Sequence, residues 1–411
     1  MIRWTIFLLF FLIIDIYAFQ SLKTLSKNPW VQGPYWLLTF LVIGNFVFHY
    51  YGFNRRDGFS HAHSYAFGFF IALLIPKMIL FIIMFGEDVF RVPQAIFRYF
   101  TEGETAKGNY FASRRQFISK LAMGIAAIPF GAIIYGIYKG KYNYKVFEYT
   151  LQFEDLPLAF DGYQITQISD IHSGSFDNMD KVAYAVDLIN EQHSDAILFT
   201  GDMVNNKAEE MKPYIDIFSR LQAKDGLYSV LGNHDYGDYI HWDSEEAKTK
   251  NLEYLKAIQK EIGFDLLLNE NRFLERQGER IALIGVENWG AGGFKKAGDL
   301  KKAVRSVEKN DFKILMSHDP SHWEKEVIND NNHFHLTLSG HTHGMQFGIE
   351  IPGWFKWSPV KWRYKYWAGI YEELGQYINV NRGFGYLAFP GRVGIWPEIT
   401  VIKLKKGTAN A

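Results

Sequence analysis

The sequence predicts a membrane domain of about four helices followed by a layered α/β domain. Four apolar stretches precede residue 140, and after residue 147 short apolar runs alternate with polar, helix-like stretches. The charge balance also changes sign: residues 1–147 carry 15 Lys and Arg against 6 Asp and Glu, whereas residues 148–411 carry 29 against 38. We therefore expect a transmembrane helical domain over residues 1–146 and a second domain over residues 147–411.

The composition excludes several classes of protein. With 48% hydrophobic and 21% charged residues in 411, the chain is not disordered as a whole. Aromatic residues make up 17%, which fits a chain that contacts lipid. The absence of cysteine excludes disulfides, zinc–cysteine sites and cysteine nucleophiles. The net negative second half disfavours nucleic acid as a partner, because phosphate contacts need a basic surface.

The apolar stretches are close to the length that a membrane-spanning helix needs. They are residues 4–19, 31–51, 65–85 and 117–138. The first is short, and a signal-peptide core is the alternative, but three further stretches and no clear cleavage site favour a retained helix. Asp15 and Lys77 lie inside predicted spans, where ionisable residues are costly. They either pair with each other or extend separately to the membrane interface.

The most basic connector suggests an orientation. Residues 87–116 contain Arg91, Arg98, Lys107, Arg114 and Arg115, so the excess of cations on cytoplasmic loops places this stretch in the cytoplasm. With four spans, the second domain then lies on the outer side. Arg114-Arg115 before an apolar run also resembles a twin-arginine export signal, and ordinary positive flanking of a span remains an equal alternative.

The second half alternates predicted strands with predicted helices, which indicates sheets covered by helices. The strand candidates are residues 163–169, 196–200, 227–231, 280–286, 312–317 and 335–339, with closing strands at 377–380 and 398–404. The helix candidates are residues 178–192, 209–221, 244–262 and 300–310.

Five of these strands run into Asp, Asn or His at their carboxyl ends, where ligands commonly gather in such sheets. The clusters are Asp170-Ile171-His172, Gly201-Asp202, Gly232-Asn233-His234-Asp235, His318-Asp319 and Gly340-His341-Thr342-His343. Any one of them alone would more readily be a cap, a turn or a structural polar residue. Five in order indicate a metal site, and oxygen and nitrogen donors without thiolate suit Mn, Fe, Zn or Mg.

With these motifs, the second half resembles the calcineurin-like metallophosphoesterases over roughly residues 148–404. Gly340-His341-Thr342-His343-Gly344-Met345-Gln346 and the segment from Asn381-Arg382-Gly383 to Pro397-Glu398 are similar to the bacterial membrane-associated branch. The resemblance implies a four-layer αββα sandwich, two divalent metal ions and an integral protein of the bacterial inner membrane. One departure is Asn205, where many relatives have Asp.

The resemblance also implies roles for single residues. Those implied for the metals are Asp170, His172 and His343 for one ion, Asn233, His318 and His341 for the other, and Asp202 as the bridge. His234 would face the phosphate, stabilising charge or protonating the leaving oxygen. Asp235 would orient His234, as carboxylates commonly do for imidazoles.

Two metals about 3.5–4 Å apart lower the pKa of a bridging water, and the resulting hydroxide attacks phosphorus in line. We therefore expect a membrane-anchored phosphoesterase acting on a phosphodiester or pyrophosphate bond in a lipid-linked or envelope substrate. A phosphomonoesterase or protein phosphatase is the alternative. A non-catalytic membrane sensor of phosphate ligands is less favoured, because Asp170, Asp202 and His234 are all present.

An aromatic and basic stretch follows His343, over residues 354–357 and 361–367. Such a composition is typical of the bilayer interface, so we expect membrane lipids and a lipid-linked or small phosphorylated substrate as partners. A packed aromatic loop, or an interface with the four spans, is the alternative. Arg382 and Arg392 either bind substrate phosphate or form internal salt bridges.

Overall fold

The computed structural model describes residues 2–102, 110–351 and 353–407. The chain forms two compact units. The first consists of Met1–Phe53 and Ser60–Ile137, and the second of Asn54–Phe59 and Tyr138–Ala411. The short loop 54–59 therefore belongs to the second unit, where the backbone N–H of His241 donates to the carbonyl of Arg56 at 2.8 Å.

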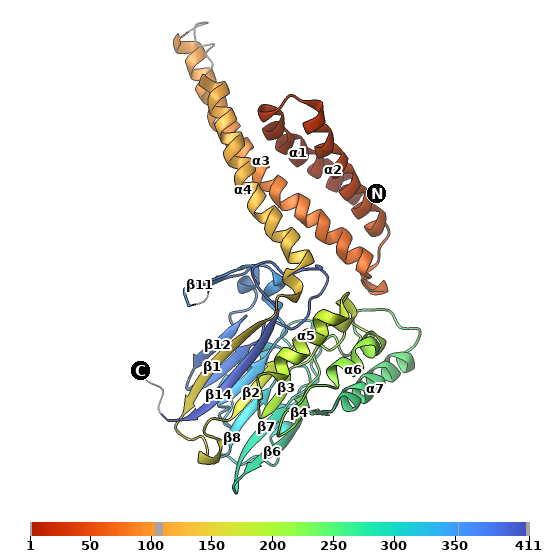
Figure 1. Ribbon diagram of the computed structural model, residues 1–411, viewed down its shortest axis with the longest axis vertical. Coiled ribbons are helices and arrows are strands. Elements are labelled where there is room, and N and C mark those ends of the chain that lie inside the picture. Colours follow the sequence, from red (N-terminus) through yellow and green to blue (C-terminus); the bar gives the residue numbers. More distant parts are fainter. Residues whose placement is uncertain (1, 103–109, 352, 408–411) are drawn as a thin grey trace. The chain divides into compact units, whose positions relative to one another are not determined.

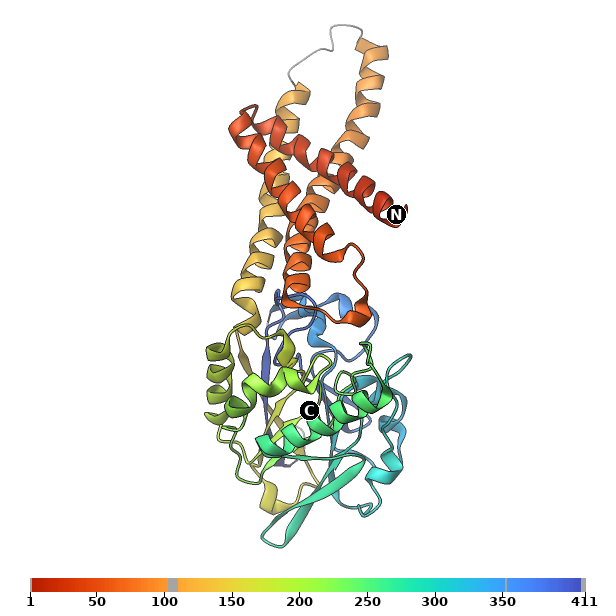
Figure 2. The same cartoon turned by 90° about the vertical axis from the view of Figure 1, so that its right-hand side faces the viewer.

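The first unit is built from four helices, coloured red to amber in Figures 1 and 2. They are α1 (Ile2–Leu25), α2 (Pro29–Tyr50), α3 (His61–Glu102) and α4 (Tyr110–Tyr138). All four are long and apolar enough to cross a membrane, which confirms the expected membrane domain. The basic stretch expected as a connector is instead helical up to Glu102 and again from Tyr110, because α3 continues well beyond its apolar part.

A buried polar cluster lies among the first three helices. The ammonium of Lys77 forms an ion pair with the carboxylate of Asp15 and donates to Thr39 Oγ1 at 2.6 Å. Tyr35 donates its hydroxyl to Asp15 Oδ1 at 2.5 Å. The side chains of Asp15 and Lys77 are both almost fully buried, so the two residues pair inside the unit and do not extend to an interface.

The second unit contains two six-stranded mixed sheets and one separate hairpin (Figure 1). In spatial order, the first sheet is β1 (Lys145–Phe153), β14 (Glu398–Lys406), β2 (Gln164–Ile168), β3 (Ala196–Phe199), β4 (Leu227–Ser229) and β5 (Phe264–Leu266). The second is β12 (Gly369–Glu373), β13 (Gln376–Val380), β9 (Leu336–Ser339), β8 (Phe312–Met316), β7 (Glu279–Gly285) and β6 (Glu270–Arg276). The hairpin is β10 (Ile349–Ile351) with β11 (Phe355–Trp357).

The buried side chains divide the second unit into four layers. One core lies between the sheets, with Ile165 and Leu198 of the first sheet packed with Ile314 and Leu338 of the second. A second core covers the outer face of the first sheet with α5 (Met179–Asn190), α6 (Ile215–Phe218) and α7 (Glu245–Ile262). A third core covers the second sheet with α8 (Leu300–Ala303) and α9 (Pro320–Lys325). This is the expected αββα sandwich.

Parallel pairing places the functional ends of the strands together. In the first sheet β2, β3 and β4 are parallel neighbours, with Ile165 opposite Ala196 and Ile197 opposite Leu227. In the second sheet β8 and β9 are parallel, with Ile314 opposite Leu336. The carboxyl ends of parallel neighbours meet at one edge of a sheet, so the loops that follow these strands converge.

Some elements differ from the sequence-based expectation. The first strand begins at Lys145 and pairs along its whole length with β14, so it crosses the boundary expected at residues 146 and 147. The helix expected over residues 209–221 is a 3₁₀ segment, Ala208–Tyr214, followed by the single turn of α6. Pro213 explains this difference, because it cannot donate an α-helical hydrogen bond inside the segment.

Candidate metal centre

Five of the seven predicted ligands lie on backbone in the left-handed region. The φ angles are 53° at Asp170, 48° at His172, 61° at Asp202, 71° at His341 and 51° at His343. For residues other than glycine this conformation costs about 1–2 kcal/mol each, so it persists only where the surrounding fold enforces it. Such strain commonly gathers at functional sites, and here it occurs directly after β2, β3 and β9.

The first group of ligands consists of Asp170, His172 and His343, whose donor atoms all lie within 4.8 Å of one another. The Nε2 atoms of His172 and His343 are only 3.0 Å apart, and His343 Nε2 is 3.2 Å from Asp170 Oδ1. Asp170 is fixed by the backbone N–H of His341, which donates to its carboxylate at 3.0 Å. All three side chains are buried.

The second group consists of Asp202, His318 and His341, joined by the amide of Asn233. Asn233 Oδ1 is 2.7 Å from His341 Nδ1 and 3.1 Å from His318 Nε2. His318 is held by its other ring nitrogen, Nδ1, which is 2.7 Å from the carbonyl of Thr200. The three ligands thus point to one place from the ends of three different strands.

Asp202 lies between the two groups. Its Oδ2 atom is 3.2 Å from His318 Nε2 in the second group and 3.6 Å from His172 Nε2 in the first. Its other oxygen, Oδ1, accepts the backbone N–H of His234 at 2.7 Å. The structure therefore brings together all seven predicted ligands, with Asp202 in the position of a bridge.

Four of the ligands have protonation states that suit a metal, whereas the charge of Asp202 raises the pKa of His318 to about 10 against the effect of burial. Burial would raise the pKa of Asp202, but the charges of His318 and His234 lower it well below its usual range. Burial likewise opposes ionisation of Asp170, whose pKa is nevertheless lowered by His343. Burial lowers the pKa of His172 and of His341, which keeps these rings neutral. Metal ligands must be ionised carboxylates and neutral imidazoles, so these states suit a cation.

His234 is oriented by a different group from the one predicted. Its Nδ1 lies 2.7 Å from the carbonyl of Asn205, and its ring packs against His172 at 4.9 Å between centroids. Asp235 instead accepts the backbone N–H groups of Gly232 at 2.9 Å and Met203 at 2.8 Å, and also that of Asp202. This corrects the expected role of Asp235, which holds the two metal-binding loops together and does not orient His234.

Three further residues support this centre, two by direct contact with a ligand and one through Asn205, and none of them was predicted from the sequence. Tyr239 accepts a hydrogen bond from Asn233 Nδ2 at 2.8 Å, and the hydroxyl of Tyr364 is 2.8 Å from His341 Nε2. Glu210 accepts the backbone N–H of Asn205 at 2.5 Å and that of Lys207 at 3.0 Å, which fixes the carbonyl that orients His234. No motif marks these positions, because each contact depends on the path of a loop.

The two arginines that were candidates for phosphate binding are used internally. Arg382 forms ion pairs with Glu398 and with Glu350, both at 2.5 Å. Arg392 is fully buried and donates to the carbonyls of Gly383 and Gly385. These contacts favour the internal alternative for both residues.

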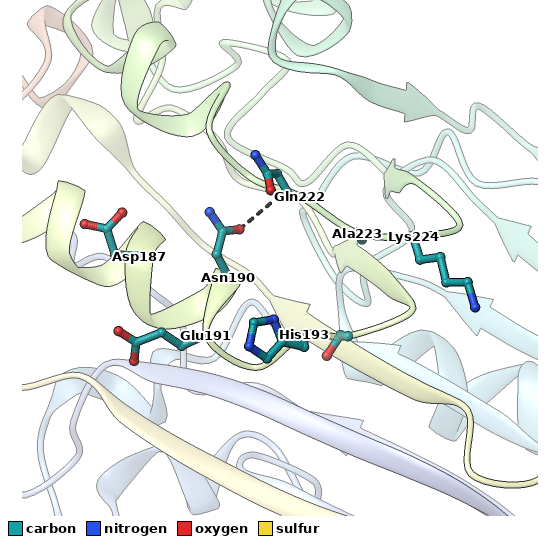
Figure 3. A pocket seen from close by; sticks show the side chains of 8 residues that line it. Asp187, Asn190, Glu191, His193, Gln222, Ala223 and Lys224 are labelled. Atoms are coloured by element: carbon teal, nitrogen blue, oxygen red, sulfur yellow. Dashed lines mark hydrogen bonds between the residues drawn. The ribbon is translucent and has the colours of Figure 1, made fainter.

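A separate surface hollow of about 620 Å³ lies at the end of α5, and Figure 3 shows its lining. Asn190 Oδ1 accepts the backbone N–H of Gln222 there at 2.9 Å. The lining residues are Asp187, Asn190, Glu191, His193, Ser194, Gln222, Ala223 and Lys224. None of the predicted ligands lines this hollow, so it is distinct from the metal centre.

The donor set fits two divalent cations. Each group offers imidazole nitrogens and carboxylate or amide oxygens, which first-row transition metals and Mg accept in proteins. The Nε2 atoms of His172 and His343 lie 3.0 Å apart, so both rings offer a nitrogen at the same point, where each can present its lone pair to one ion.

Comparisons with known proteins agree with this geometry. Residues 2–141 match the family model of a probable calcineurin-like phosphoesterase transmembrane domain, and residues 163–345 match that of the calcineurin-like phosphoesterases. The uncharacterized metallophosphoesterase YkuE of Bacillus subtilis is 29% identical over 71% of this chain and 98% of its own length. An uncharacterized metallophosphoesterase of Helicobacter pylori is 27% identical over 72% of this chain and 74% of its own.

A zebrafish (Danio rerio) transmembrane protein with a metallophosphoesterase domain is 26% identical over 70% of this chain and 62% of its own length. The similarity thus extends beyond bacteria. Together with the two matched models and the converging ligand groups, it shows a membrane protein with a divalent-metal hydrolase domain. The chain belongs to the calcineurin-like metallophosphoesterases and is a phosphoester hydrolase.

Proposed function

We propose that this chain is a membrane-anchored, dinuclear phosphoesterase that cleaves a phosphodiester or pyrophosphate bond in a lipid-linked or envelope substrate. The observation that carries the dinuclear proposal is the position of Asp202, whose Oδ2 faces both His318 and His172. The membrane-resident substrate is supported by the four helices long enough to span a bilayer. An enzyme fixed to a membrane meets substrates of that membrane at high local concentration.

The chain's own residues suit hydrolysis of a phosphoester. When bound, two divalent ions supply activation of water and neutralisation of the phosphate charge. Asn205 holds Nδ1 of His234, so Nε2 is the ring atom left for the substrate. In its protonated form, His234 stabilises the phosphate there or passes the Nε2 proton to the leaving oxygen. Hydrogen bonds with tyrosine hydroxyls fix two of the ligands: Tyr239 contacts Asn233, and Tyr364 contacts His341.

Hydrolysis by full-length protein in detergent tests this proposal. Mn, Zn, Mg and Fe are supplied separately, and a generic monoester, a diester and a lipid pyrophosphate are offered. We expect cleavage of the diester or the lipid pyrophosphate, lost in Asp202→Ala and in His234→Ala. Preference for the monoester would favour a phosphomonoesterase or protein phosphatase. Folded, metal-loaded protein that cleaves none of these esters would contradict the proposal.

We further propose that the catalytic domain lies outside the cytoplasm, at the bacterial inner membrane. The support is the basic stretch of residues 87–116, in which Arg91 lies in the last part of α3 and Arg115 in the first part of α4. Arg115 also pairs with Asp88 at 2.6 Å. A reporter fused after residue 411 tests the placement: activity of a periplasmic reporter is expected, and activity of a cytoplasmic one would overturn it.

A further inference from the structure

The hairpin formed by β10 and β11 is apolar on the face that points to solvent. Ile349 lies opposite Trp357 and Ile351 lies opposite Phe355, so these four side chains share one face of the two strands. Ile349, Ile351 and Phe355 are exposed, and Trp354 in the turn is 81% exposed. Soluble hairpins show the reverse arrangement, with the apolar face turned to the core.

The polar face of the same hairpin is turned to the domain. Glu350 forms an ion pair with the buried Arg382 at 2.5 Å, and its side chain is only 13% exposed. Lys356, opposite Glu350, donates to the carbonyl of Ala368 at 2.5 Å. Two specific polar contacts therefore hold the hairpin with its apolar side outward, so the exposure is built into the fold.

One more apolar side chain, Trp362, extends this surface and is 77% exposed. Trp362 packs edge-on against Trp357 of the hairpin, with 5.9 Å between ring centroids. We call this set the aromatic surface; it consists of Ile349, Ile351, Trp354, Phe355 and Trp362. Exposed apolar patches bounded by polar residues mark interaction sites.

The charges around the aromatic surface are mainly positive. Residues 345–365 contain four cations, Lys356, Lys361, Arg363 and Lys365, against the single acid Glu350; of these cations, Lys365 pairs with Glu373 at 2.5 Å. Glu350 is neutralised by Arg382, and Lys361 has no ion-pair partner among the described residues. Aromatic rings with Lys and Arg beside them fit the headgroup region of a bilayer, where cations meet lipid phosphates.

The aromatic surface is tied directly to the metal ligands. Ser358, just after β11, donates to the carbonyl of Gly344 at 2.7 Å, and Gly344 follows the ligand His343. Thr342 donates to the carbonyl of Trp367 at 2.7 Å, and the hydroxyl of Tyr364 is 2.8 Å from the ligand His341. A surface that binds lipid at this position would hold the metal centre beside the headgroups.

We propose that the aromatic surface inserts into the interface of a bilayer that contains anionic phospholipid. Its catalytic consequence, delivery of a membrane-resident phosphoester to the metal centre, rests on the proposed function. Insertion itself does not rest on it, so the two can fail separately. The alternative interpretation, a packed aromatic loop, describes only part of the stretch, because Tyr364, Tyr366 and Trp367 are buried whereas Trp354 and Trp362 are exposed.

Depth measurements on spin-labelled protein test insertion directly. The chain has no cysteine, so single variants of the full-length protein can be labelled without background. Trp354→Cys and Trp362→Cys carry the label, and Lys224→Cys, exposed at the hollow in Figure 3, is the matched control. The protein is reconstituted in vesicles of phosphatidylethanolamine and phosphatidylglycerol, and collisions with oxygen and with a water-soluble nickel chelate are compared.

We expect labels at positions 354 and 362 to favour oxygen and to be shielded from nickel, with the reverse at position 224. Nickel access at 354 equal to that at 224 would overturn the proposal. Shielding from both reagents would also overturn it, because the label would then be covered by protein. Thermal unfolding and bound metal of each variant, unchanged from the parent, show that the fold is intact.

The catalytic consequence is tested with Trp354→Asp. Cleavage of a lipid pyrophosphate in vesicles should fall roughly tenfold, as expected if about 1.4 kcal/mol of surface binding is lost. Cleavage of a generic water-soluble ester should stay the same, because position 354 is exposed and is not a ligand. Equal loss on both substrates would contradict a docking role. If the labels insert but the protein cleaves no ester, membrane insertion of the aromatic surface is supported and the proposed function is contradicted.

Discussion

Buried charge is handled in opposite ways in the two units of this protein. Among the membrane helices, one carboxylate, Asp15, meets one ammonium, Lys77, and the hydroxyls of Thr39 and Tyr35 take up further hydrogen bonds. The charges and hydrogen bonds of this set are matched among its own members. In the metal centre, ring nitrogens such as those of His172 and His343 face each other at 3.0 Å, and a shared carboxylate lies beside them.

The difference shows how a structural cluster and a ligand site can be told apart without a bound ion. A buried ion pair that is matched in charge and hydrogen bonding needs nothing further, and its cost lies in desolvation. A buried set with an excess of lone pairs on strained backbone is stable only with a cation or extra protons. Here the charge of Asp202 raises the pKa of His318 to about 10 despite burial. Without a cation, the ring of His318 therefore carries the extra proton.

The largest effect should come from removing the shared carboxylate. Asp202→Ala should lower bound metal at both groups and reduce hydrolysis by more than about a hundredfold, since even outer contacts of metal ligands cost 10- to 100-fold. His343→Ala, in the first group alone, should lose about one metal equivalent per chain. Elemental analysis and steady-state rates measure both.

The control for this prediction is Asp187→Asn, which changes an exposed carboxylate at the separate hollow. It should keep two metals and full activity. Equal metal loss in Asp202→Ala and His343→Ala would argue against a bridge and in favour of two independent sites.

The next largest effect should be on stability, from Lys77→Met. This substitution leaves the Asp15 carboxylate buried without its partner, which should cost about 3–5 kcal/mol. The double variant Asp15→Leu with Lys77→Met should recover most of this loss, because an apolar pair avoids desolvation altogether. Detergent-induced unfolding of the three variants measures the difference.

Hydrolysis of a water-soluble ester by the folded fraction should stay unchanged in these variants, since no ligand is altered. If the double variant is no more stable than Lys77→Met, the pair is not a closed structural unit, and the comparison with the metal centre fails.

A smaller effect should appear in the pH dependence of stability. His322 packs on Trp289, and burial lowers its pKa to about 4 although Asp319 acts in the opposite direction. Below pH 6.5 the unfolded chain takes up a proton that the folded chain does not, so stability falls as pH decreases from about 6.5 to about 4. His322 alone should account for up to about 3 kcal/mol of this fall.

His322→Asn should therefore flatten the loss of stability across that pH range, measured by thermal unfolding with saturating metal. His193→Asn, which removes an exposed imidazole at the hollow, is the matched control. If the stability of His322→Asn falls as steeply with decreasing pH as that of the parent, the His322 ring is not the cause of the fall.

Sequence reasoning succeeded where function follows regular structure. Asp170, Asp202 and His341 each come directly after a short buried strand, and the carboxyl ends of neighbouring strands must meet, so their convergence was predictable. The membrane helices were predictable for a similar reason, because length and apolarity alone decide them.

Reasoning from the sequence failed where a loop path decides the contact. The resemblance implied that Asp235 orients His234, but the turn points its carboxylate at backbone N–H groups instead. The outward apolar face of the β10–β11 hairpin was also hidden, because the alternation of Ile349, Glu350 and Ile351 does not reveal which face is covered.

The smallest effect should come from Glu210, a positioning residue that acts on His234 through Asn205. Its carboxylate accepts the N–H groups of Asn205 and Lys207, and Asn205 in turn holds His234 Nδ1 through its carbonyl. In Glu210→Gln one acceptor oxygen becomes an NH₂ group, which opposes a backbone N–H. We expect kcat to fall about tenfold with KM and bound metal unchanged, since such outer contacts tune orientation. Glu209→Gln, one residue earlier and exposed, is the matched control and should be neutral. Loss of metal in Glu210→Gln would instead show that Glu210 stabilises the metal-binding loops. An unchanged kcat would show that the Asn205 carbonyl orients His234 without help from Glu210.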